Sequence, residues 1–416
     1  MEYAKPSAID ADIIEKAVQL RHLLHSEPEL SGRENETKRR LMDFLTENTS
    51  LAVRDMGGWF YAVYRAPGEE PGRRRIAFRA DMDALPIDEG NALPYSSKTP
   101  GVSHKCGHDG HMASLAAFAL TVDRRGSKND IFFLFQNAEE TGTGAKKAKT
   151  LIGLEKIDEI YGYHNMPGFP LCSVAVHTGA AACASKGLVF RFTGENSHAS
   201  QPENGRNPAF ALARLTAEIP LLVRIAAEND PDDTQYNNET ESGGTARRIA
   251  PGAYMSRDGI VMCTVVGTHI GSRVDGGEEA FGTSAGYGRL MMTIRAENEK
   301  RMDLLESLLL ERAKALAEED GINFASECRE PFPETRNDAA CAEKVRAAVR
   351  KLGFETAVWN EPFRSSEDFG WYTKLTPGAL FYIGSGEEHA PLHTVGYDYP
   401  DALIPAAAAL FYELSK

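Results

Sequence analysis

The stretch Ile131-Phe-Phe-Leu-Phe-Gln-Asn-Ala-Glu-Glu140 joins an uncharged, largely apolar run to two adjacent acidic side chains. The run has the length of a buried strand. Side chains that directly follow such a strand stand at its carboxyl end, where ligands bind in open α/β sheets. Two neighbouring carboxylates at that place are costly unless a cation lies near them. The stretch therefore predicts a buried sheet with a polar site at its edge.

The first part of the chain alternates short apolar runs with stretches of helical periodicity. The expected strands lie at 59–64, 76–80, 131–136, 159–163 and 173–176, and the expected helices at 12–25, 111–122 and 143–152. Short apolar strands separated by helices are typical of a largely parallel sheet that helices cover on both faces. We therefore predict an α/β sandwich architecture for this part of the chain.

The pattern changes near residue 186. The expected elements are then a strand at 188–193, a helix at 207–227, strands at 260–267 and 288–295, a helix at 298–318 and a strand at 321–327. This β-α-β-β-α-β order is typical of a small separate domain. Two polar, glycine-rich stretches, 228–258 and 268–287, separate some of these elements. Loops of that length are usually functional or mobile.

The first pattern resumes near residue 332. It gives a helix at 340–351, strands at 355–359 and 379–383, and a last helix from about residue 401. A chain of 416 residues also exceeds what one hydrophobic core usually serves. We predict an α/β fold in which a mainly parallel-sheet catalytic domain is interrupted by a lid and dimerisation domain. The expected boundaries are 1–185 and 332–416 for the catalytic domain and 186–331 for the lid.

Composition and charge argue against several classes of protein. The net charge is −14 and no basic stripe is present, so we expect no nucleic acid partner. No run approaches the roughly 18 apolar residues of a membrane span, and the polar N-terminus does not resemble a secretory signal. The six scattered cysteines predict reduced thiols. We expect a cytoplasmic enzyme that binds a small molecule and no membrane.

Acids, imidazoles and one thiol lie beside the ends of successive predicted strands. They are Asp81, Asp83, Cys106, His108, His111, Glu139, Glu140, His164 and His393. The carboxyl ends of parallel strands meet at one edge of a sheet, and this mixture of side chains is typical of a transition-metal site. A single histidine or cysteine is more often a structural residue. The joint occurrence at successive strand ends favours a metal site.

These residues lie in sequence blocks that resemble the zinc-dependent aminoacylase and carboxypeptidase family. The resemblance is to its amidohydrolase branch of hippurate hydrolases and indole-acetyl-amino-acid hydrolases. It covers the chain from about residue 20 to the last helix. The blocks are Arg79-Ala-Asp-Met-Asp-Ala-Leu-Pro86, Gly101-Val-Ser-His-Lys-Cys-Gly-His-Asp-Gly-His111, Leu134-Phe-Gln-Asn-Ala-Glu-Glu140, Tyr163-His-Asn-Met-Pro167, Ser197-His-Ala199, Ser366-Glu-Asp-Phe369 and Ala390-Pro-Leu-His393.

The resemblance implies a centre of two divalent metal ions per chain. The implied ligands are Cys106, His108, Glu140, His164 and His393. Cys106 would bridge the two ions as a thiolate, where the peptidase branch uses an aspartate. A soft thiolate suits zinc, with manganese, cobalt or nickel as alternatives, better than magnesium or calcium.

The resemblance also implies roles for residues around these ligands. Glu139 matches the general base that takes a proton from the attacking water. Asp83 matches an acid that orients a ligand. Asp81 stands where the peptidases carry a ligating histidine, and His111 is expected to support the centre or the fold.

In the lid, His198 matches a residue that reaches the active site of the neighbouring subunit and stabilises the oxyanion. The resemblance therefore implies a homodimer formed through the lid domain. The family's lid loop carries an asparagine that contacts the substrate. Neither candidate for that loop, 243–251 or 281–286, supplies it. We expect the substrate carboxylate or acyl group to be held by Arg247 or Arg248 instead.

The predicted activity is hydrolysis of the amide bond of N-acyl amino acids or related small amides, as in hippurate hydrolysis. One alternative is a metallo-dipeptidase or carboxypeptidase, against which Cys106 argues. Another is a homologue with an altered lid that binds a ligand without turnover. The complete set of metal ligands and the intact Glu139 argue against that alternative.

Overall fold

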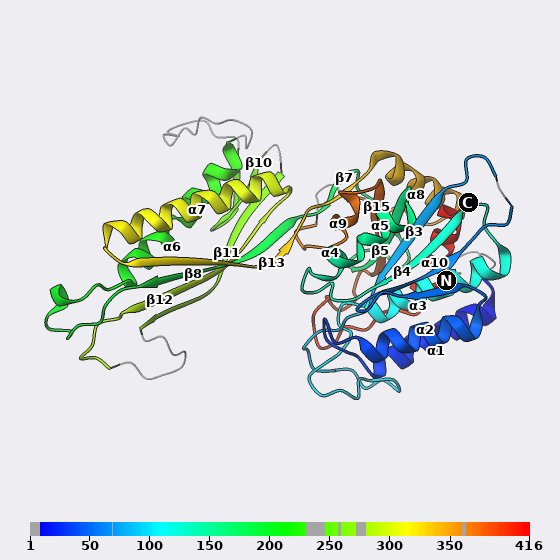
Figure 1. Cartoon of the computed structure of the whole chain (residues 1–416), viewed down its shortest axis with the longest axis horizontal. Helices are drawn as coiled ribbons and strands as arrows, with labels where there is room; N and C mark the ends of the chain where they lie inside the picture. Colours follow the sequence, from blue (N-terminus) through cyan, green and yellow to red (C-terminus); the bar gives the residue numbers. More distant parts are fainter. Residues whose placement is uncertain (1–8, 69, 230–245, 257–258, 272–279, 360–362) are drawn as a thin grey trace. The chain divides into compact units, whose positions relative to one another are not determined.

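The computed structural model describes residues 9–68, 70–229, 246–256, 259–271, 280–359 and 363–416 (Figure 1). The chain divides into two compact units. The first comprises Met1–Ala181, Thr335–Pro362 and Glu367–Lys416, and the second comprises Ala182–Glu334 and Phe363–Ser366. Each unit has its own hydrophobic core.

The first unit contains a seven-stranded sheet in the order β1-β2-β4-β3-β5-β15-β6. Its strands are β1 (Ala52–Asp55), β2 (Phe60–Tyr64), β3 (Arg75–Asp81), β4 (Asp130–Gln136), β5 (Glu159–Pro167), β6 (Val174–Ala175) and β15 (Gly378–Gly386). The central strands β4, β3, β5 and β15 are parallel, and the outer strands pair antiparallel. The prediction of a mainly parallel sheet is confirmed, with antiparallel edges that the sequence did not indicate.

Successive side chains of a strand point to opposite faces of the sheet, and β4 is buried along its whole length, so both faces are covered. The helices of the unit are α1 (Ala11–Ser26), α2 (Asn35–Asn48), α3 (His108–Arg125), α4 (Gly144–Ala148), α5 (Thr150–Glu155), α8 (Ala339–Leu352), α9 (Gly370–Thr373) and α10 (Leu403–Leu414). On one face, Phe78 of β3 contacts Phe118 of α3 and Phe411 of α10, with ring centroids 4.7 Å and 5.0 Å away. On the other face, Arg79 hydrogen-bonds to Asp368, just before α9. A short two-stranded sheet, β7 (Gly179–Ala182) with β14 (Thr335–Asn337), completes the unit.

The second unit is a six-stranded antiparallel sheet with two long helices. Its elements are β8 (Ala184–Thr193), the 3-10 turn η1 (Pro202–Asn204), α6 (Ala209–Glu228), β9 (Arg247–Ala250), β10 (Ala253–Ser256), β11 (Gly259–Gly271), β12 (Tyr287–Ala296), α7 (Glu299–Glu319) and β13 (Asn323–Phe332). The strand order is β13-β8-β12-β11-β10-β9, and α6 and α7 contact each other and the sheet. The α/β fold class with an inserted domain is confirmed, and β9 and β10 add two strands to the predicted β-α-β-β-α-β order.

Several boundaries differ from the predicted ones. The polar stretch 228–258 contains β9 and β10, which extend the edge of the sheet and are partly exposed, so they lack a strong apolar signal. The strand expected at 355–359 is absent: Thr356 makes one isolated bridge to Val174, and Val358 is exposed. The helix expected at 143–152 divides into α4 and α5. Parts of the two polar stretches, 230–245, 257–258 and 272–279, lie outside the described residues.

A buried group of charges ties α1 to the start of α3. Asp109 Oδ2 of α3 accepts hydrogen bonds from Arg21 Nη1 at 3.1 Å and His25 Nδ1 at 2.8 Å. The side chains of Arg21, His25 and Asp109 have no exposed surface. His25 Nε2 lies 2.8 Å from Glu89 Oε2, and Lys105 Nζ lies 2.5 Å from Glu89 Oε1. The segment that carries Cys106 is therefore anchored by charge pairs on its buried side.

This anchoring predicts a pH dependence of stability. Although burial opposes the charged ring, Asp109 and Glu89 raise the pKa of His25 from 6.5 to about 9. The stabilisation is thus fully present below pH 6.5 and is lost as the pH rises through 9. We expect the free energy of unfolding of the metal-free protein to fall by about 2–3 kcal/mol across that interval. All three tryptophans, Trp59, Trp359 and Trp371, belong to the first unit, so their fluorescence in guanidinium unfolding reports on it.

His25→Gln should be less stable at pH 6.5 and should show a flatter profile between pH 6.5 and 9. His177→Gln, which changes a histidine outside the group, serves as the matched control and should keep the wild-type slope. An unchanged slope in His25→Gln would rule out His25 as the titrating group.

Candidate functional site

Seven of the predicted side chains gather at the carboxyl ends of the parallel strands. Asp81 ends β3 and Asp83 follows it; Glu139 and Glu140 follow β4; His164 lies in the last part of β5 rather than after it; Cys106 precedes α3 and His108 opens it. His393 joins them from the loop after β15, with its backbone N–H donated to Lys105 O at 2.8 Å. Between Cys106 and His108, Gly107 has φ +95°, and a Cβ there would lie 2.5 Å from Asn165 Oδ1.

Cys106 Sγ lies at the centre of this group. It is 3.4 Å from His164 Nε2 and 3.2 Å from His393 Nε2. Glu140 Oε1 lies 3.7 Å from His108 Nε2 and 3.6 Å from His393 Nε2. The ligand atoms of Cys106, His108 and His164 lie within 4.8 Å of one another, and so do those of Cys106, Glu140 and His393. Two sets of metal-ligand atoms therefore share one thiol.

Hydrogen bonds leave the correct imidazole nitrogens available to a cation. His108 Nδ1 lies 2.9 Å from the carbonyl oxygen of Asp83, and His164 Nδ1 lies 2.7 Å from that of Asn165. A carbonyl only accepts, so both Nδ1 atoms carry hydrogen, and it is the Nε2 lone pair of each neutral ring that would bind a cation. Among the described residues, the buried His108 Nε2 and Glu140 Oε1 have no hydrogen-bond partner. Unpaired buried atoms of this kind are costly, and a bound cation would satisfy both.

The electrostatic environment of the Cys106 thiol also favours a bound cation. Burial, together with the nearby carboxylates of Glu140 and Glu139, raises the pKa of the Cys106 thiol well above its ordinary range. Without positive charge, a thiolate at this place is therefore disfavoured. A divalent ion inverts this situation because a coordinated thiol loses its proton. The donor set of one thiol, imidazoles and a carboxylate fits a transition-metal ion.

Asp83 and His111 lie close to the ligand atoms and make several polar contacts. Asp83 Oδ2 accepts hydrogen bonds from Glu140 N at 3.0 Å and Ser31 Oγ at 2.6 Å, and Asp83 Oδ1 lies 3.2 Å from His108 Nδ1. His111 Nδ1 lies 2.6 Å from Asp81 Oδ1, and His111 Nε2 lies 2.5 Å from Asn165 Oδ1. Both ring nitrogens of His111 already have partners, which agrees with its predicted supporting position.

Glu139 lies beside this group, buried, with its Oε1 3.4 Å from the backbone nitrogen of Asp368. Burial, followed by the charges of Glu367 and Glu140, raises the pKa of Glu139 well above that of an ordinary glutamate. The residue before it, Ala138, has φ +50°. A carboxylate with a raised pKa, placed next to a metal-ligand set, is suited to accept and return a proton.

A buried arginine behind the site was not assigned a role from the sequence. Arg79 Nη1 donates to Asp81 Oδ2 at 2.6 Å, and its Nη2 lies 2.8 Å from Asp368 Oδ1 and 3.0 Å from Glu367 Oε1. Its side chain is 1% exposed, so it supplies positive charge inside the acidic group. Arg79 and the Ser366-Glu-Asp-Phe369 stretch both belong to the sequence blocks that carry the family resemblance. Their pairing across the chain was not visible in the sequence.

Three predicted residues, His198, Arg247 and Arg248, lie in the second unit. His198 is exposed, and its Nδ1 accepts the backbone N–H of Ser200 at 3.2 Å and lies 2.7 Å from Ser200 Oγ. Its Nε2 therefore carries the hydrogen of the neutral ring. Arg247 and Arg248 are exposed on β9. Gly243, Gly244 and Thr245 of the first loop candidate lie outside the described residues.

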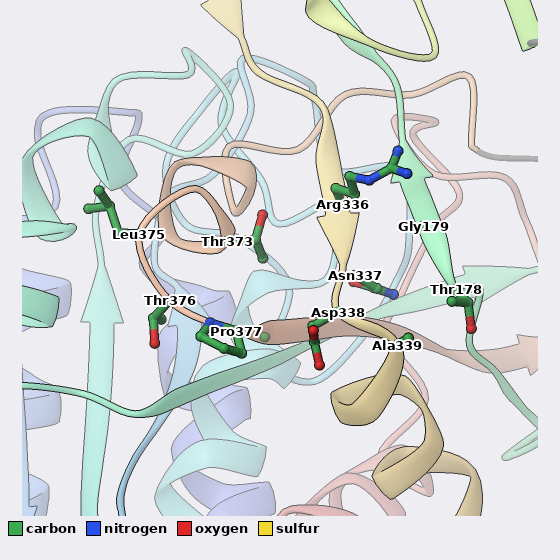
Figure 2. Close-up of a pocket in the computed structure, with 11 residues that line it drawn as sticks. Thr178, Gly179, Arg336, Asn337, Asp338, Ala339, Thr373, Leu375, Thr376 and Pro377 are labelled. Carbon is green, nitrogen blue, oxygen red and sulfur yellow. The ribbon is translucent and has the colours of Figure 1, made fainter.

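A cavity of about 580 Å³ lies elsewhere in the first unit, at the amino end of β15 (Figure 2). Its lining includes Asn337, Asp338 and Gly378. Asn337 Nδ2 already donates to the carbonyls of His177 and Leu380, and Asp338 Oδ1 accepts the backbone N–H of Cys341. The cavity contains none of the predicted ligands, so we assign it no part in the chemistry.

The sequence is similar to known hydrolases over nearly its whole length. The family model of peptidase family M20/M25/M40 matches residues 77–416. The IAA-amino acid hydrolase ILR1-like 2 of Arabidopsis thaliana is 28% identical, covering 99% of this chain and 86% of the relative. The N-acetyldiaminopimelate deacetylase of Lacticaseibacillus casei is 26% identical, covering 97% of each chain. The crystal structure of Bacillus subtilis YXEP, a dinuclear metal binding peptidase, has a TM-score of 0.76 at 22% identity, covering 98% of each chain.

None of the described helices has the length and apolar character required to span a membrane.

The shared thiol predicts a specific loss of metal. Wild-type protein equilibrated with zinc and desalted should retain about two ions per chain by elemental analysis, whereas Cys106→Ser should retain less than about one. Cys341→Ser changes another buried free cysteine and is the matched control, expected to bind as wild type does. Equal zinc content in Cys106→Ser and wild type would contradict a bridging thiolate.

Proposed function

The chain belongs to peptidase family M20/M25/M40, and from this membership we propose that it is a dinuclear metal-dependent amidohydrolase of N-acyl amino acids or related small amides. Hydrolysis of amide bonds is the activity of the family to which it belongs. The observation that supports the proposal most strongly is the pair of ligand sets that share Cys106 Sγ. Glu139 lies directly beside them, within 4.8 Å of His108 and Glu140 ligand atoms.

We propose that Cys106, His108, Glu140, His164 and His393 would hold the two ions, with Cys106 shared. Zinc is the favoured ion, with cobalt or nickel as alternatives, because thiolate and imidazole donors suit these ions; manganese is a further alternative, for which Glu140 supplies the oxygen donor. When bound, a pair of divalent ions supplies charge that polarises the scissile carbonyl and acidifies the attacking water. Asp83 keeps His108 and Glu140 in position through the hydrogen bonds described above.

In this proposal Glu139 moves the proton. Its carboxylate takes a proton from the attacking water and delivers it to the nitrogen of the departing amine, so that no free amide anion forms. Burial and the charges of Glu367 and Glu140 raise the pKa of Glu139, which favours the protonated form that it takes between the two proton transfers. Arg79 forms ion pairs with Asp81, Glu367 and Asp368, and its positive charge offsets part of their negative charge beside Glu139.

The proposed substrate class is inferred from the activities for which the relatives are named. One relative is named for hydrolysis of IAA-amino acids, another for removal of acetyl from N-acetyldiaminopimelate, and a third, 28% identical, for N-acetyl-L-cysteine. An acyl group joined to an amino acid is common to these names. We propose the same class for this chain, with Arg247 or Arg248 as the contact for the substrate carboxylate. Both guanidinium groups lie on an exposed strand. Hydrolysis of dipeptides in preference to N-acyl amino acids would favour the dipeptidase alternative instead.

We further propose that the enzyme acts as a homodimer through the second unit, with His198 reaching the site of the neighbouring subunit. The hydrogen bonds from Ser200 support this role because they leave His198 Nε2–H as a donor for an oxyanion.

A cytoplasmic location is also proposed. All six cysteines are free, as expected in a reducing compartment.

The proposal predicts that Glu139→Gln separates metal binding from turnover. The variant should keep about two zinc ions per chain, because its ligands are intact, and should lose at least about 100-fold in kcat. The measurement is the initial rate on a panel of N-acetyl, N-benzoyl and N-indoleacetyl amino acids and dipeptides with added zinc, manganese or cobalt. Glu15→Gln on the exposed face of α1 is the control and should leave kcat unchanged. Wild-type activity in metal-loaded Glu139→Gln would refute the assignment.

The role of His198 can be tested by mixing subunits. Glu139→Gln and His198→Ala chains should each be inactive as homodimers. If His198 acts across the dimer, co-expression should produce heterodimers with one complete site, and random pairing should restore roughly a quarter of wild-type activity. Purified heterodimers without activity would exclude action across the dimer.

A further inference from the structure

We propose that Glu34 is a positioning residue for the base: its carboxylate holds the peptide of Ala138 in the conformation that directs Glu139 toward the metal-ligand set. This inference rests on the proposed function, because the role of Glu139 belongs to that proposal. Glu34 was not among the residues that the sequence singled out. It also lies outside residues 77–416, the part matched by the family model.

The contact itself is short and buried. Glu34 Oε1 accepts the backbone N–H of Ala138 at 2.7 Å. Glu34 is 4% exposed and Ala138 is 3% exposed. A hydrogen bond from a backbone N–H to a buried carboxylate is among the stronger ones in proteins. This N–H belongs to the Asn137–Ala138 peptide, so its orientation fixes φ of Ala138 and, through it, the backbone that leads into Glu139.

Glu34 does not serve the helix that it precedes. It occupies the N-cap position of α2, but its side chain makes no capping hydrogen bond. The backbone N–H of Thr37 in the first turn is bonded instead to Glu29 Oε2 at 2.8 Å. The described residues also give Glu34 no lysine or arginine partner in an ion pair. Besides the Ala138 N–H, its carboxylate meets the backbone N–H groups of Gly32 and of Glu34 itself, so it also stabilises the turn that leads into α2.

The burial of Glu34 has a cost. Burial, followed by the charge of Asp83, raises the pKa of Glu34 to about 7. A carboxylate that remains buried under such conditions is retained for its hydrogen bonds. The backbone N–H of Ala138 is the partner nearest to the catalytic groups.

The Ala138 peptide needs an external restraint. Its φ of +50° lies in the left-handed region, which costs an alanine about 1 kcal/mol or more. The carbonyl oxygen of Ala138 is held by the backbone N–H groups of Thr143 at 3.2 Å and Gly144 at 3.0 Å. Glu34 holds the N–H on the other side of the same residue. The strained conformation is thus fixed at both ends, by the following turn and by Glu34.

The segment that carries Glu34 also contacts Asp83, which in turn contacts two of the proposed ligands. Ser31 Oγ donates to Asp83 Oδ2 at 2.6 Å, and Leu30 forms a bridge to Ala84. Asp83 in turn contacts His108 and Glu140. The connection between α1 and α2 therefore contacts both the support of the ligands and the support of the base. Within this connection, Glu34 is the residue whose side chain bonds to the N–H of Ala138, which makes its effect separable from that of Ser31 on Asp83.

The test compares Glu34→Met, which keeps the length of the side chain without an acceptor, with Glu34→Gln, which keeps an acceptor oxygen. Glu34→Met should keep its zinc and a KM within about threefold of wild type, while kcat falls about 10- to 100-fold. Glu34→Gln should recover most of that loss. Glu36→Met at the exposed start of α2 is the matched control and should behave as wild type. A Glu34→Met enzyme with wild-type kcat, or one that loses zinc and kcat in parallel, would overturn the inference.

A double-mutant cycle with Ala138→Gly tests the mechanism of positioning. Glycine adopts positive φ without strain, so the conformation needs less support. The effect of Glu34→Met on kcat should therefore be at least about threefold smaller in the Ala138→Gly background. Equal effects in both backgrounds would show that Glu34 does not act through this peptide.

Hydrogen exchange supplies a readout that needs no substrate and no metal. In the metal-free wild type, the amide of Ala138 should be protected, and Glu34→Met should increase its exchange rate at least about tenfold. An unprotected Ala138 amide in the wild type would refute the contact even if Glu34→Met fails to fold. If the wild type hydrolyses no amide, the proposed function fails, and the exchange result still decides whether Glu34 restrains the peptide.

Discussion

The structure of the site depends on one electrostatic constraint: Glu139, Glu140 and the thiol of Cys106 are packed together at the edge of the sheet, with Glu139 and Cys106 buried. Burial raises the pKa of all three groups. Negative charge on these groups is therefore unfavourable unless positive charge is brought to them. Arg79 supplies part of that charge from behind, and the unpartnered His108 Nε2 and Glu140 Oε1 face a place where a cation would supply the rest. The surrounding hydrogen bonds of Asp83, Asn165 and Lys105 orient the ligand atoms around that place.

The fold explains how residues far apart in the chain reach this point. Parallel strands β3, β4 and β5 end at one edge of the sheet, and each ends in or near a ligand or its support. The start of α3 is brought there by the buried pairing of Asp109 with Arg21 and His25. The loop with His393 is attached to the same segment through the carbonyl oxygen of Lys105. A stable first unit is therefore a condition for an ordered ligand set.

Sequence alone indicated the features that depend on local pattern. The apolar run 131–136 and the acids behind it predicted a buried strand and a polar edge because both are encoded in adjacent residues. It did not indicate contacts between distant segments. Glu34 meets Ala138 across 104 positions, and Arg79 meets Asp368 across 289. The sequence also did not indicate the exposed strands β9 and β10, which carry few buried side chains. Conversely, the strand expected at 355–359 is absent, and Thr356 makes only an isolated bridge. The roles of His198, Arg247 and Arg248 depend on the second unit and remain predictions.

The central claim is that the thiol of Cys106 is shared by two metal ions. Anomalous diffraction at the zinc absorption edge, recorded from crystals of the zinc-loaded protein, tests it most directly. We expect two anomalous peaks per chain, each about 2.3 Å from Cys106 Sγ, one near His108 and His164 and one near Glu140 and His393. A single peak, or two peaks of which one does not contact Cys106 Sγ, would contradict it.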